Sequence, residues 1–290
     1  MSDTAVKSEK KKWSKKKKIV VIVLSVLLAL IVLVVAGGIY ALNWYCKTAD
    51  YDVVSTDAQV TLVAHRGMRS VAPENTTASF EEAGKHGYWG AECDIYMTKD
   101  GRWIVSHDIN SYRMMDETAN IEKKTYDELM EMTVDNGSNI ENYPNLKFCS
   151  LEEYLEICSQ YNMVAVIELK GKNNTEHYDK VVDLVNQYGV NAVYISFQFE
   201  NLQKIRELTD AQVYYLVQEI EDEDIELAKS LENCGIDFNG NKEKNFETDI
   251  IDRCQQEGLP LGAWTINTLE SMERLTDKGV TLITTDCITY

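Results

Sequence analysis

The sequence predicts a (β/α)8 barrel, the TIM-barrel class of α/β fold, preceded by one N-terminal transmembrane helix. From about residue 59 to residue 290, short β-branched runs alternate with amphipathic stretches, which is typical of parallel βα units. An uncharged and largely aliphatic run, Ile19–Leu42, precedes this region. No glycine-rich nucleotide loop follows the first predicted strand, which disfavours the alternative, a doubly wound open sheet.

The first 18 residues form a basic tail. They hold eight lysines against Asp3 and Glu9, a local net charge of +6. Because the whole chain carries −18, the remaining residues carry −24. Nucleic-acid binding requires clustered Lys and Arg to neutralise phosphates. The acidic body therefore argues against a nucleic-acid partner.

The run Ile19–Leu42 is long enough for a helix to cross a membrane, which takes roughly 20 apolar residues. A cleaved signal peptide is the alternative, but its apolar region would be about 7–15 residues long and would end in a small-residue cleavage site. Lysines directly before a span stay on the cytoplasmic side. We therefore expect a single-pass plasma-membrane protein with a cytoplasmic tail over residues 1–18, a transmembrane helix over 19–42, a linker over 43–58 and an extracytoplasmic barrel over 59–290.

Seven cysteines stand at scattered positions, and none forms a C-x-x-C pair. This spacing disfavours a zinc site. Outside the cytoplasm some of these cysteines could pair as disulfides, whereas single buried thiols are the more common arrangement. The sequence leaves the pairing open.

Each element of the barrel follows from its local pattern. The predicted strands are short and rich in β-branched residues, and the predicted helices show an apolar face. The strands are expected at Val60–Ala64, Ala91–Tyr96, Trp103–Ser106, Val164–Leu169, Ala192–Phe197, Val213–Val217, Ile236–Phe238, Leu261–Ile266 and Thr281–Thr284. The helices are expected at Thr76–His86, Leu151–Tyr161, His177–Tyr188, Phe199–Leu208, Asp224–Asn233, Phe246–Glu257 and Leu269–Lys278.

Nine strands is one too many for the barrel, and a hairpin explains the surplus. The turn signal Lys99-Asp100-Gly101 separates two strand-like runs. If these runs fold back on each other, His107 lies next to Glu92 and Asp94, and one arm stands outside the barrel. Residues 108–150 are polar and irregular apart from a helix near Tyr126–Met132, and are expected to form an insertion over one end of the barrel.

Charged residues interrupt the predicted strands. Glu92 and Asp94 stand at i and i+2, as do Glu168 and Lys170, so each pair points to one face of its strand. Buried charges are costly unless they are paired or bind a metal. A structural salt bridge is the alternative for each pair alone. Three carboxylates that converge with a single lysine are best satisfied by a hard divalent cation with oxygen ligands.

Two of the four histidines, His65 and His107, end strand-like runs. Imidazole titrates near neutral pH, which suits an acid/base pair. Arg66 and Lys170 supply positive charge for phosphate oxygens. With a cation to stabilise the transition state, these groups are the parts that phosphodiester cleavage requires. No Gly-x-Ser-x-Gly motif is present, so acyl transfer through a serine has no support.

Eight short motifs occur in order between residues 59 and 290. They are His65-Arg66-Gly67, Pro73-Glu74-Asn75, Glu92-x-Asp94, His107-Asp108, Glu168-Leu169-Lys170, Ser196-Phe197, Trp264-Thr265 and Thr285-Asp286. In these motifs the chain resembles the glycerophosphodiester phosphodiesterase family, a relative of phosphoinositide-specific phospholipase C. The resemblance implies a TIM barrel with a divalent metal site.

The resemblance also implies a role for each matching residue. Glu92, Asp94 and Glu168 would hold Ca²⁺ or Mg²⁺, and His65 and His107 would be the general acid and base. Arg66 and Lys170 would bind the phosphate, and Trp264 would pack against the substrate, although it could instead be a core aromatic. Glu74 would orient His65 and Arg66 at the end of the first strand, or it would contact the metal site. For Asn75 a structural role competes with a role in the site, because it could be the N-cap of the helix that follows.

The expected reaction is the hydrolysis of small glycerophosphodiesters to glycerol 3-phosphate and an alcohol. One alternative keeps the chemistry and changes the substrate to a lysophospholipid, as in a lysophospholipase D, or to a glycerophosphate polymer of the cell envelope. The membrane anchor motivates it. Another alternative is a catalytically silent surface-binding barrel. This alternative is disfavoured because the chain has a charged residue at every position where the family's motifs have one.

Overall fold

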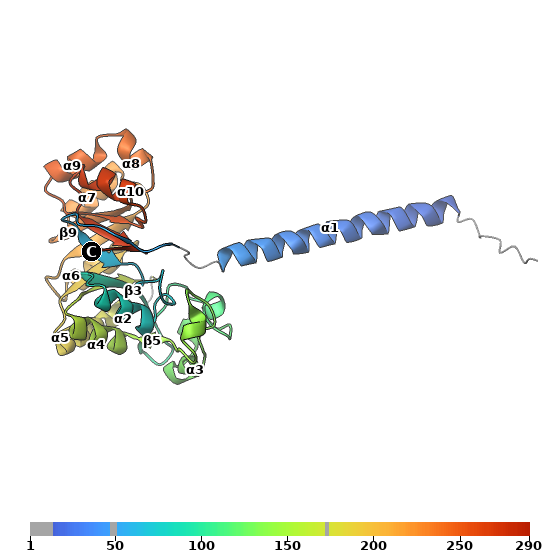
Figure 1. Ribbon diagram of the computed structural model, residues 1–290, viewed down its shortest axis with the longest axis horizontal. Coiled ribbons are helices and arrows are strands. Elements are labelled where there is room, and N and C mark those ends of the chain that lie inside the picture. Colours follow the sequence, from blue (N-terminus) through green and yellow to red (C-terminus); the bar gives the residue numbers. More distant parts are fainter. Residues whose placement is uncertain (1–13, 47–50, 172–173) are drawn as a thin grey trace, which may run out of the picture. The chain divides into compact units, whose positions relative to one another are not determined.

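The computed structural model describes residues 14–46, 51–171 and 174–290. Residues 1–13 of the predicted basic tail lie outside the described residues. The chain divides into two units, residues 1–47 and residues 48–290, which are described separately below. Figure 1 shows the elements of both units.

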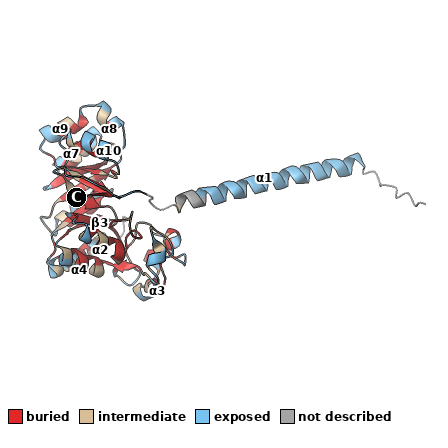
Figure 2. Cartoon of the chain, in the orientation of Figure 1, coloured by how far each residue is buried: buried red, intermediate tan, exposed pale blue. Residues whose placement is uncertain are grey.

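The first unit contains one long helix, α1 (Lys15–Tyr45). Its segment Lys15–Ala41 has a mean hydropathy of 3.6 and none of it is buried within the protein, as the exposed colouring of α1 shows (Figure 2). By length and composition this helix is a candidate transmembrane span, which agrees with the predicted segment Ile19–Leu42.

In the described part of the second unit, eight parallel strands close into a barrel. The barrel strands are β2 (Thr61–Ala64), β3 (Gly90–Met97), β6 (Val164–Leu169), β7 (Ala192–Ser196), β8 (Val213–Val217), β9 (Cys234–Asn239), β10 (Leu261–Trp264) and β11 (Leu282–Thr285). The barrel closes because β2 pairs with β11 on one side and with β3 on the other. The predicted fold class is therefore confirmed.

Helices follow the strands and surround them (Figure 1). They are α2 (Thr77–Lys85), α4 (Leu151–Tyr161), α5 (Tyr178–Tyr188), α6 (Phe199–Arg206), α7 (Asp222–Lys229), α8 (Lys244–Glu247), α9 (Ile250–Gln256) and α10 (Leu269–Thr276). Local sequence sets their ends. At α4 the Ser150 hydroxyl accepts from the Glu153 amide while the Glu153 carboxylate accepts from the Ser150 amide, which is a capping box.

The predicted hairpin is present. Strand β4 (Trp103–Val105) pairs antiparallel with β3, and Ile95 lies opposite Val105. A short strand, β5 (Cys149–Ser150), pairs with β4 outside the barrel. The insertion between them has its own small apolar core. It contains α3 (Tyr126–Met130) and the 3-10 turns η1 (Ser111–Arg113), η2 (Ile121–Lys123) and η3 (Ile140–Asn142). A further 3-10 turn, η4 (Thr175–His177), precedes α5.

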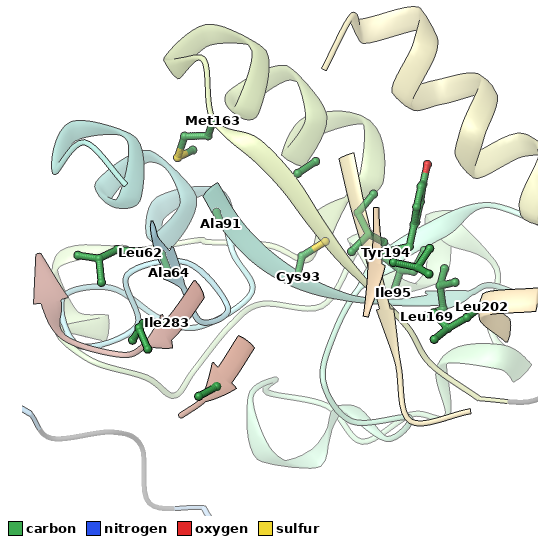
Figure 3. Close-up of a cluster of buried hydrophobic side chains, with 14 of the residues drawn as sticks. Leu62, Ala64, Ala91, Cys93, Ile95, Met163, Leu169, Tyr194, Leu202 and Ile283 are labelled. Carbon is green, nitrogen blue, oxygen red and sulfur yellow. The ribbon is translucent and has the colours of Figure 1, made fainter. Parts of the chain in front are cut away.

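Strand alternation separates two cores. Outward residues such as Cys93, Ile95 and Leu169 pack against the helices in the large outer core (Figure 3). Inward residues such as Val63 and Val166 form the smaller interior core. Because side chains alternate along a strand, charged residues in register with the inward set must point into the barrel.

Several elements differ from the sequence-based expectation. Strand β5 was not expected, and α7 begins at Asp222 and ends at Lys229 rather than covering Asp224–Asn233. The helix predicted at Phe246–Glu257 is two helices, α8 and α9, because Thr248 has an extended backbone and its hydroxyl accepts from the amide of Ile250. Within residues 43–58, predicted as a linker, β1 (Val54–Ser55) pairs in parallel with β12 (Ile288–Thr289).

Candidate active site

A cavity of about 250 Å³ lies at the carboxyl ends of the barrel strands. This is where the loops that follow the strands of a (β/α)8 barrel converge. The residues that line it are His65, Arg66, Glu92, His107, Glu168, Ile195, Phe197, Leu216, Gln218, Asp237, Trp264 and Thr284. One part of this lining is charged and the other is apolar, so the cavity suits a small molecule with both kinds of surface.

The turn after β2 places the first catalytic candidates. Arg66 and Gly67 have φ angles of +56° and +74°, a region that favours glycine. A Cβ atom on Gly67 would lie 2.4 Å from the hydroxyl oxygen of Ser79, so only glycine fits. The amide of Arg66 donates to Oε2 of Glu92 at 2.7 Å, and the Arg66 carbonyl accepts from the Ser79 hydroxyl. These bonds hold His65 at the cavity.

Three carboxylates converge inside the barrel as predicted. Glu92 and Asp94 point inward from β3, and Glu168 points inward from the neighbouring strand β6, where it lies opposite Asp94. All three are buried, and one oxygen of each lies within 4.8 Å of the others. Oδ1 of Asp94 accepts no hydrogen bond from the described residues, and its one ion-pair partner among them is the Lys170 ammonium. This set of hard oxygen donors fits a divalent cation.

The electrostatics of the cluster point the same way. Burial and the charges of Asp94 and Glu168 raise the pKa of Glu92 well above its usual range. Burial and Asp94 raise the pKa of Glu168 to about 7. Burial alone would raise the pKa of Asp94 too, but Lys170, His107 and Arg66 hold it well below its usual range. A cation among the three carboxylates would relieve this repulsion.

Lys170 lies against these carboxylates. Its Nζ is 2.9 Å from Oε1 of Glu168 and 3.2 Å from Oδ1 of Asp94. Nε of Arg66 lies 3.6 Å from Oδ2 of Asp94. Lys170 and Arg66 together supply fewer positive charges than the three carboxylates supply negative ones, so the cluster would accept a cation. Among the two residues predicted to bind phosphate, Arg66 lines the cavity and Lys170 does not.

His65 is paired with Asp286, which follows β11. Nδ1 of His65 and Oδ1 of Asp286 are 2.7 Å apart, and Oδ2 of Asp286 accepts from the Asn267 amide group. Burial and the charge of Arg66 lower the pKa of His65, against the opposing effect of Asp286. His65 is therefore neutral near pH 7, and with Nδ1–H bound to Asp286 its Nε2 is the proton acceptor.

His107 has a similar arrangement at the end of the hairpin. Its Nδ1 lies 2.8 Å from Oδ1 of Asp108. Oδ2 of the same carboxylate accepts from Nε of Arg113 at 2.7 Å. Burial alone would raise the pKa of Asp108, but the hydrogen bond with His107 and the charge of Arg113 lower it to about 2. Each histidine thus has an ionised aspartate behind it.

Glu74 links the two histidine–aspartate pairs. Its Oε1 accepts from Arg66 at 2.8 Å and from Arg113 at 2.5 Å, and its Oε2 lies 2.9 Å from Arg69. Nε of Arg69 in turn is 3.7 Å from Asp286. A continuous network of charges therefore runs from one histidine to the other through a single buried glutamate.

Asn75 is not the N-cap of α2. Thr76 has that place, because its hydroxyl accepts from the amide of Ser79. The side chain of Asn75 instead donates to Oδ2 of Asp94 at 2.8 Å. The N-cap prediction for Asn75 is wrong because its backbone is left-handed, with φ at +55°, rather than extended as an N-cap requires.

The other part of the cavity is apolar. Phe197 and Trp264 meet edge to face, with ring centroids 5.5 Å apart, and Ile195 and Leu216 line the same cavity. Nε1 of Trp264 donates to the backbone oxygen of Asp237 at 3.1 Å. The Trp264 ring is thus half-buried and borders the space for a ligand.

Of the residues predicted for the site, His65, Arg66, Glu92, His107, Glu168 and Trp264 line the cavity, whereas Asp94, Lys170 and Glu74 lie behind its lining. Sequence reasoning missed Arg69, Arg113 and Asp237 as site residues, and it quoted Asp108 and Asp286 without giving them roles. Asp286 follows a predicted strand and Asp237 interrupts one, so the charge signal that identified Glu92 applies to both. No local pattern marks Arg113, because the insertion has no periodicity.

Comparison with known proteins agrees with this geometry. Residues 65–289 match the model of the glycerophosphoryl diester phosphodiesterase family. Glycerophosphodiester phosphodiesterase 1 of Bos taurus is 25% identical over 242 residues, which cover 73% of each chain. The glycerophosphodiester phosphodiesterase of Caldanaerobacter subterraneus is 26% identical over 236 residues, covering 78% of this chain and 93% of that one.

Solved structures show the same barrel. A phosphodiesterase of Oleispira antarctica, in complex with the product sn-glycerol-3-phosphate, superposes with a TM-score of 0.72 and 26% identity, covering 80% of this chain and 96% of that one. A glycerophosphodiester phosphodiesterase of Parabacteroides distasonis has a TM-score of 0.65 and 26% identity, with coverages of 81% and 94%.

Proposed function

Because the chain belongs to the glycerophosphoryl diester phosphodiesterase family, and so is a glycerophosphodiester phosphodiesterase, we propose that it hydrolyses glycerophosphodiesters to glycerol 3-phosphate and an alcohol by two-histidine catalysis with a divalent cation. One observation carries the proposal. Two histidines, each backed by an aspartate, border one cavity together with Glu92 and Glu168, and Asp94 lies within 4.8 Å of those two carboxylates.

Glu92, Asp94 and Glu168 are the residues that would hold the cation, Ca²⁺ or Mg²⁺. When bound there, a divalent cation would polarise a phosphoryl oxygen and offset the negative charge that develops in the transition state. Lys170 keeps part of the carboxylate charge compensated, and the amide of Arg66 fixes the orientation of Glu92.

His65 is proposed as the general base. Its lowered pKa keeps it neutral, so Nε2 can take the proton of the attacking hydroxyl group, which is either water or the 2-hydroxyl of the glycerol. Attack by the 2-hydroxyl would give a cyclic phosphate that water then opens. Asp286 holds the ring in the required tautomer and stabilises the imidazolium once it forms.

His107 is proposed as the general acid that protonates the leaving alcohol. The carboxylate of Asp108 lies 2.8 Å from Nδ1 of His107 and fixes the orientation of the ring. The side chain of His107 is 33% exposed, compared with 15% for His65, so His107 stands on the more open side of the cavity. A leaving alcohol of variable size is best placed on that side.

Arg66 is proposed to bind the phosphate. It lines the cavity, and its pKa is raised by Glu74, Asp94 and Glu92 despite burial, so it is always charged. Glu74 fixes the direction of the guanidinium through the 2.8 Å hydrogen bond. The charge would stabilise both the substrate and the transition state.

The apolar part of the cavity favours a second candidate substrate. Ile195, Phe197, Leu216 and Trp264 give one part of the cavity an apolar surface. A lysophospholipid carries an acyl chain on its glycerol, and this chain would pack against the apolar surface of the cavity. In this reading the same residues act as a lysophospholipase D.

A substrate panel tests these proposals. The full chain in detergent is incubated with glycerophosphocholine, lysophosphatidylcholine and a glycerophosphate polymer, and the phosphate monoester is quantified. Glycerophosphocholine is expected to react fastest. Faster release from lysophosphatidylcholine would favour the second candidate, and the absence of turnover with all three would reject the hydrolase proposal.

The apolar helix α1 supports a further proposal, that the chain is a single-pass plasma-membrane protein with its barrel outside the cytoplasm. The lysines before the helix favour this orientation. In intact cells, protease added outside should digest the barrel. Complete protection until the cells are broken would reject this topology, and recovery of a mature chain that begins after Leu42 would indicate a cleaved signal sequence.

A further inference from the structure

Asp237 is a buried acid in an otherwise apolar stretch of the barrel interior. Its neighbours on β9, Ile236 and Phe238, point outward into the outer core, so Asp237 points inward. In the sheet it lies between Leu216 and Gly262. Its exposure is 2%, yet it lines the cavity.

The carboxyl group of Asp237 has no partner among the residues that the structure describes. No hydrogen bond or ion pair reaches its side chain from the part of the chain that the structure describes, and Oδ1 is fully buried without a partner. Trp264 donates to the backbone oxygen of Asp237 and not to its carboxyl group. A buried polar group without a partner destabilises the fold, so its presence facing a cavity points to a partner supplied from outside.

The surrounding residues leave room for this group. A Cβ atom at Gly262 would lie 2.8 Å from Oδ1 of Asp237, so glycine there makes space for the carboxyl group. The neighbouring interior residues Leu216, Ile195 and Trp264 belong to the apolar interior core. Tyr214, another interior residue, feels the charge of Asp237 but forms no hydrogen bond with it. The carboxyl group therefore has no polar partner among the described residues, and the cavity that it lines is where one can reach it.

The charge state narrows the chemistry of that partner. Burial and the charge of Glu168 raise the pKa of Asp237 to about 8. At neutral pH the group is then a carboxylic acid with one O–H donor and one C=O acceptor. A hydroxyl group, which both donates and accepts, matches it. A cationic headgroup would require the ionised form.

We propose that Asp237 is a specificity-determining residue that binds a free hydroxyl group of the glycerol half of the substrate. The inference rests on the proposed function. In glycerophosphodiesters the alcohol varies, whereas the glycerol phosphate half is the same in every substrate. An acid at a fixed position inside the barrel can therefore bind a glycerol hydroxyl group in each of them. The phosphate is bound by the residues on the charged side of the cavity.

Binding measurements on the full chain in detergent with Mg²⁺ test this directly. The ligands are sn-glycerol 3-phosphate, 3-hydroxypropyl phosphate, which lacks the 2-hydroxyl, and 2-hydroxypropyl phosphate, which lacks the terminal hydroxyl. Wild type is expected to bind glycerol 3-phosphate at least about tenfold more tightly than one of the two analogues, since a site that hydrogen-bonds a hydroxyl rejects the ligand lacking it. Asp237→Ala should lose that preference, and Asp237→Asn, which keeps a donor and an acceptor, should retain most of it.

Turnover gives a second readout. Asp237→Ala should raise KM for glycerophosphocholine by about ten- to a hundredfold with a smaller change in kcat, and by the same factor for glycerophosphoethanolamine. Mg²⁺ affinity should be unchanged in both variants. Because Asp237→Ala removes an unpaired buried polar group, its melting temperature should equal or exceed that of wild type.

Four results would overturn the proposal. Asp237→Ala could weaken all three ligands equally, it could leave the preference intact, or it could lose Mg²⁺ and so act as part of the metal centre. An effect confined to the choline ester would identify the cationic alcohol as the partner and would also reject it. If wild type fails to hydrolyse any diester, the proposed function fails, but the binding series still decides the role of Asp237.

Discussion

The Nδ1 atom of His65 lies 2.7 Å from the Oδ1 atom of Asp286, although the two residues are 221 positions apart in the chain. The contact forms because β2 and β11 are neighbours that close the barrel, with Ala64 opposite Thr285. The first and last parts of the barrel sequence therefore supply the two members of one histidine–aspartate pair.

This contact predicts the pH dependence of catalysis. With His65 as base, kcat/KM should rise with pH along an acidic limb whose midpoint lies below 6.5, because burial and Arg66 lower the pKa of His65. Asp286 opposes that effect, so Asp286→Asn should lower kcat and move the midpoint to still lower pH. A pH–rate profile of both proteins checks this. A midpoint that moves up in the variant would contradict the role of Asp286.

The acid and base roles can be separated by the leaving group. His65→Ala and His107→Ala should each lose about 10²- to 10⁴-fold in kcat with glycerophosphocholine. With glycerol phospho-p-nitrophenol, whose leaving group needs no proton, His107→Ala should recover most of its rate and His65→Ala should not. The exposed His86 provides the control, since His86→Ala should retain wild-type rates. Recovery in His65→Ala alone would reverse the assignment.

Glu74 should contribute strongly to stability. It is 4% exposed and contacts three arginines, so Glu74→Ala would leave their charges without their shared partner. Removing one partner from a buried ion pair costs about 3–5 kcal/mol in free energy of unfolding. Denaturant unfolding measures this change.

The matched control for Glu74 is Glu207→Ala. Glu207 pairs with Lys204 at the surface, and such pairs contribute about 0–1 kcal/mol. If the two variants prove equally stable, the network through Glu74 is not a structural support of the site.

Cation binding should stabilise the fold. Filling the site among Glu92, Asp94 and Glu168 would relieve their repulsion, and at a hundredfold excess over Kd it adds about 2.7 kcal/mol. Thermal unfolding with increasing Mg²⁺ or Ca²⁺ should therefore show a rising melting temperature in wild type. Asp94→Asn should lose most of this rise, whereas Glu207→Ala should keep it. An equal rise in Asp94→Asn would place the bound cation elsewhere.

Much of the barrel could be predicted from sequence because its strands are short apolar runs that contain few charged residues. Val164–Leu169 and Val213–Val217 were predicted with their observed bounds. The hairpin of β3 and β4 followed from a turn signal and one surplus strand. The short pairing of β1 with β12 was missed, since two residues give no periodicity.

The site residues that lie on strands could be predicted, because side chains alternate between the two faces of a strand. Glu92, Asp94 and Glu168 converge because each is an inward residue of neighbouring strands. The contacts of Arg69 and Arg113 were not predictable, because they depend on how irregular loops fold over the barrel mouth. Asn75 was misassigned because the sequence Asn75-Thr76 does not reveal that the backbone of Asn75 is left-handed.

The most direct test of the account is the rate of glycerol 3-phosphate release from glycerophosphocholine by the full chain, before and after removal of divalent cations. The account predicts that EDTA abolishes the rate and that readdition of Mg²⁺ or Ca²⁺ restores it. An unchanged rate in EDTA would contradict the role given to Glu92, Asp94 and Glu168, and with it the central claim.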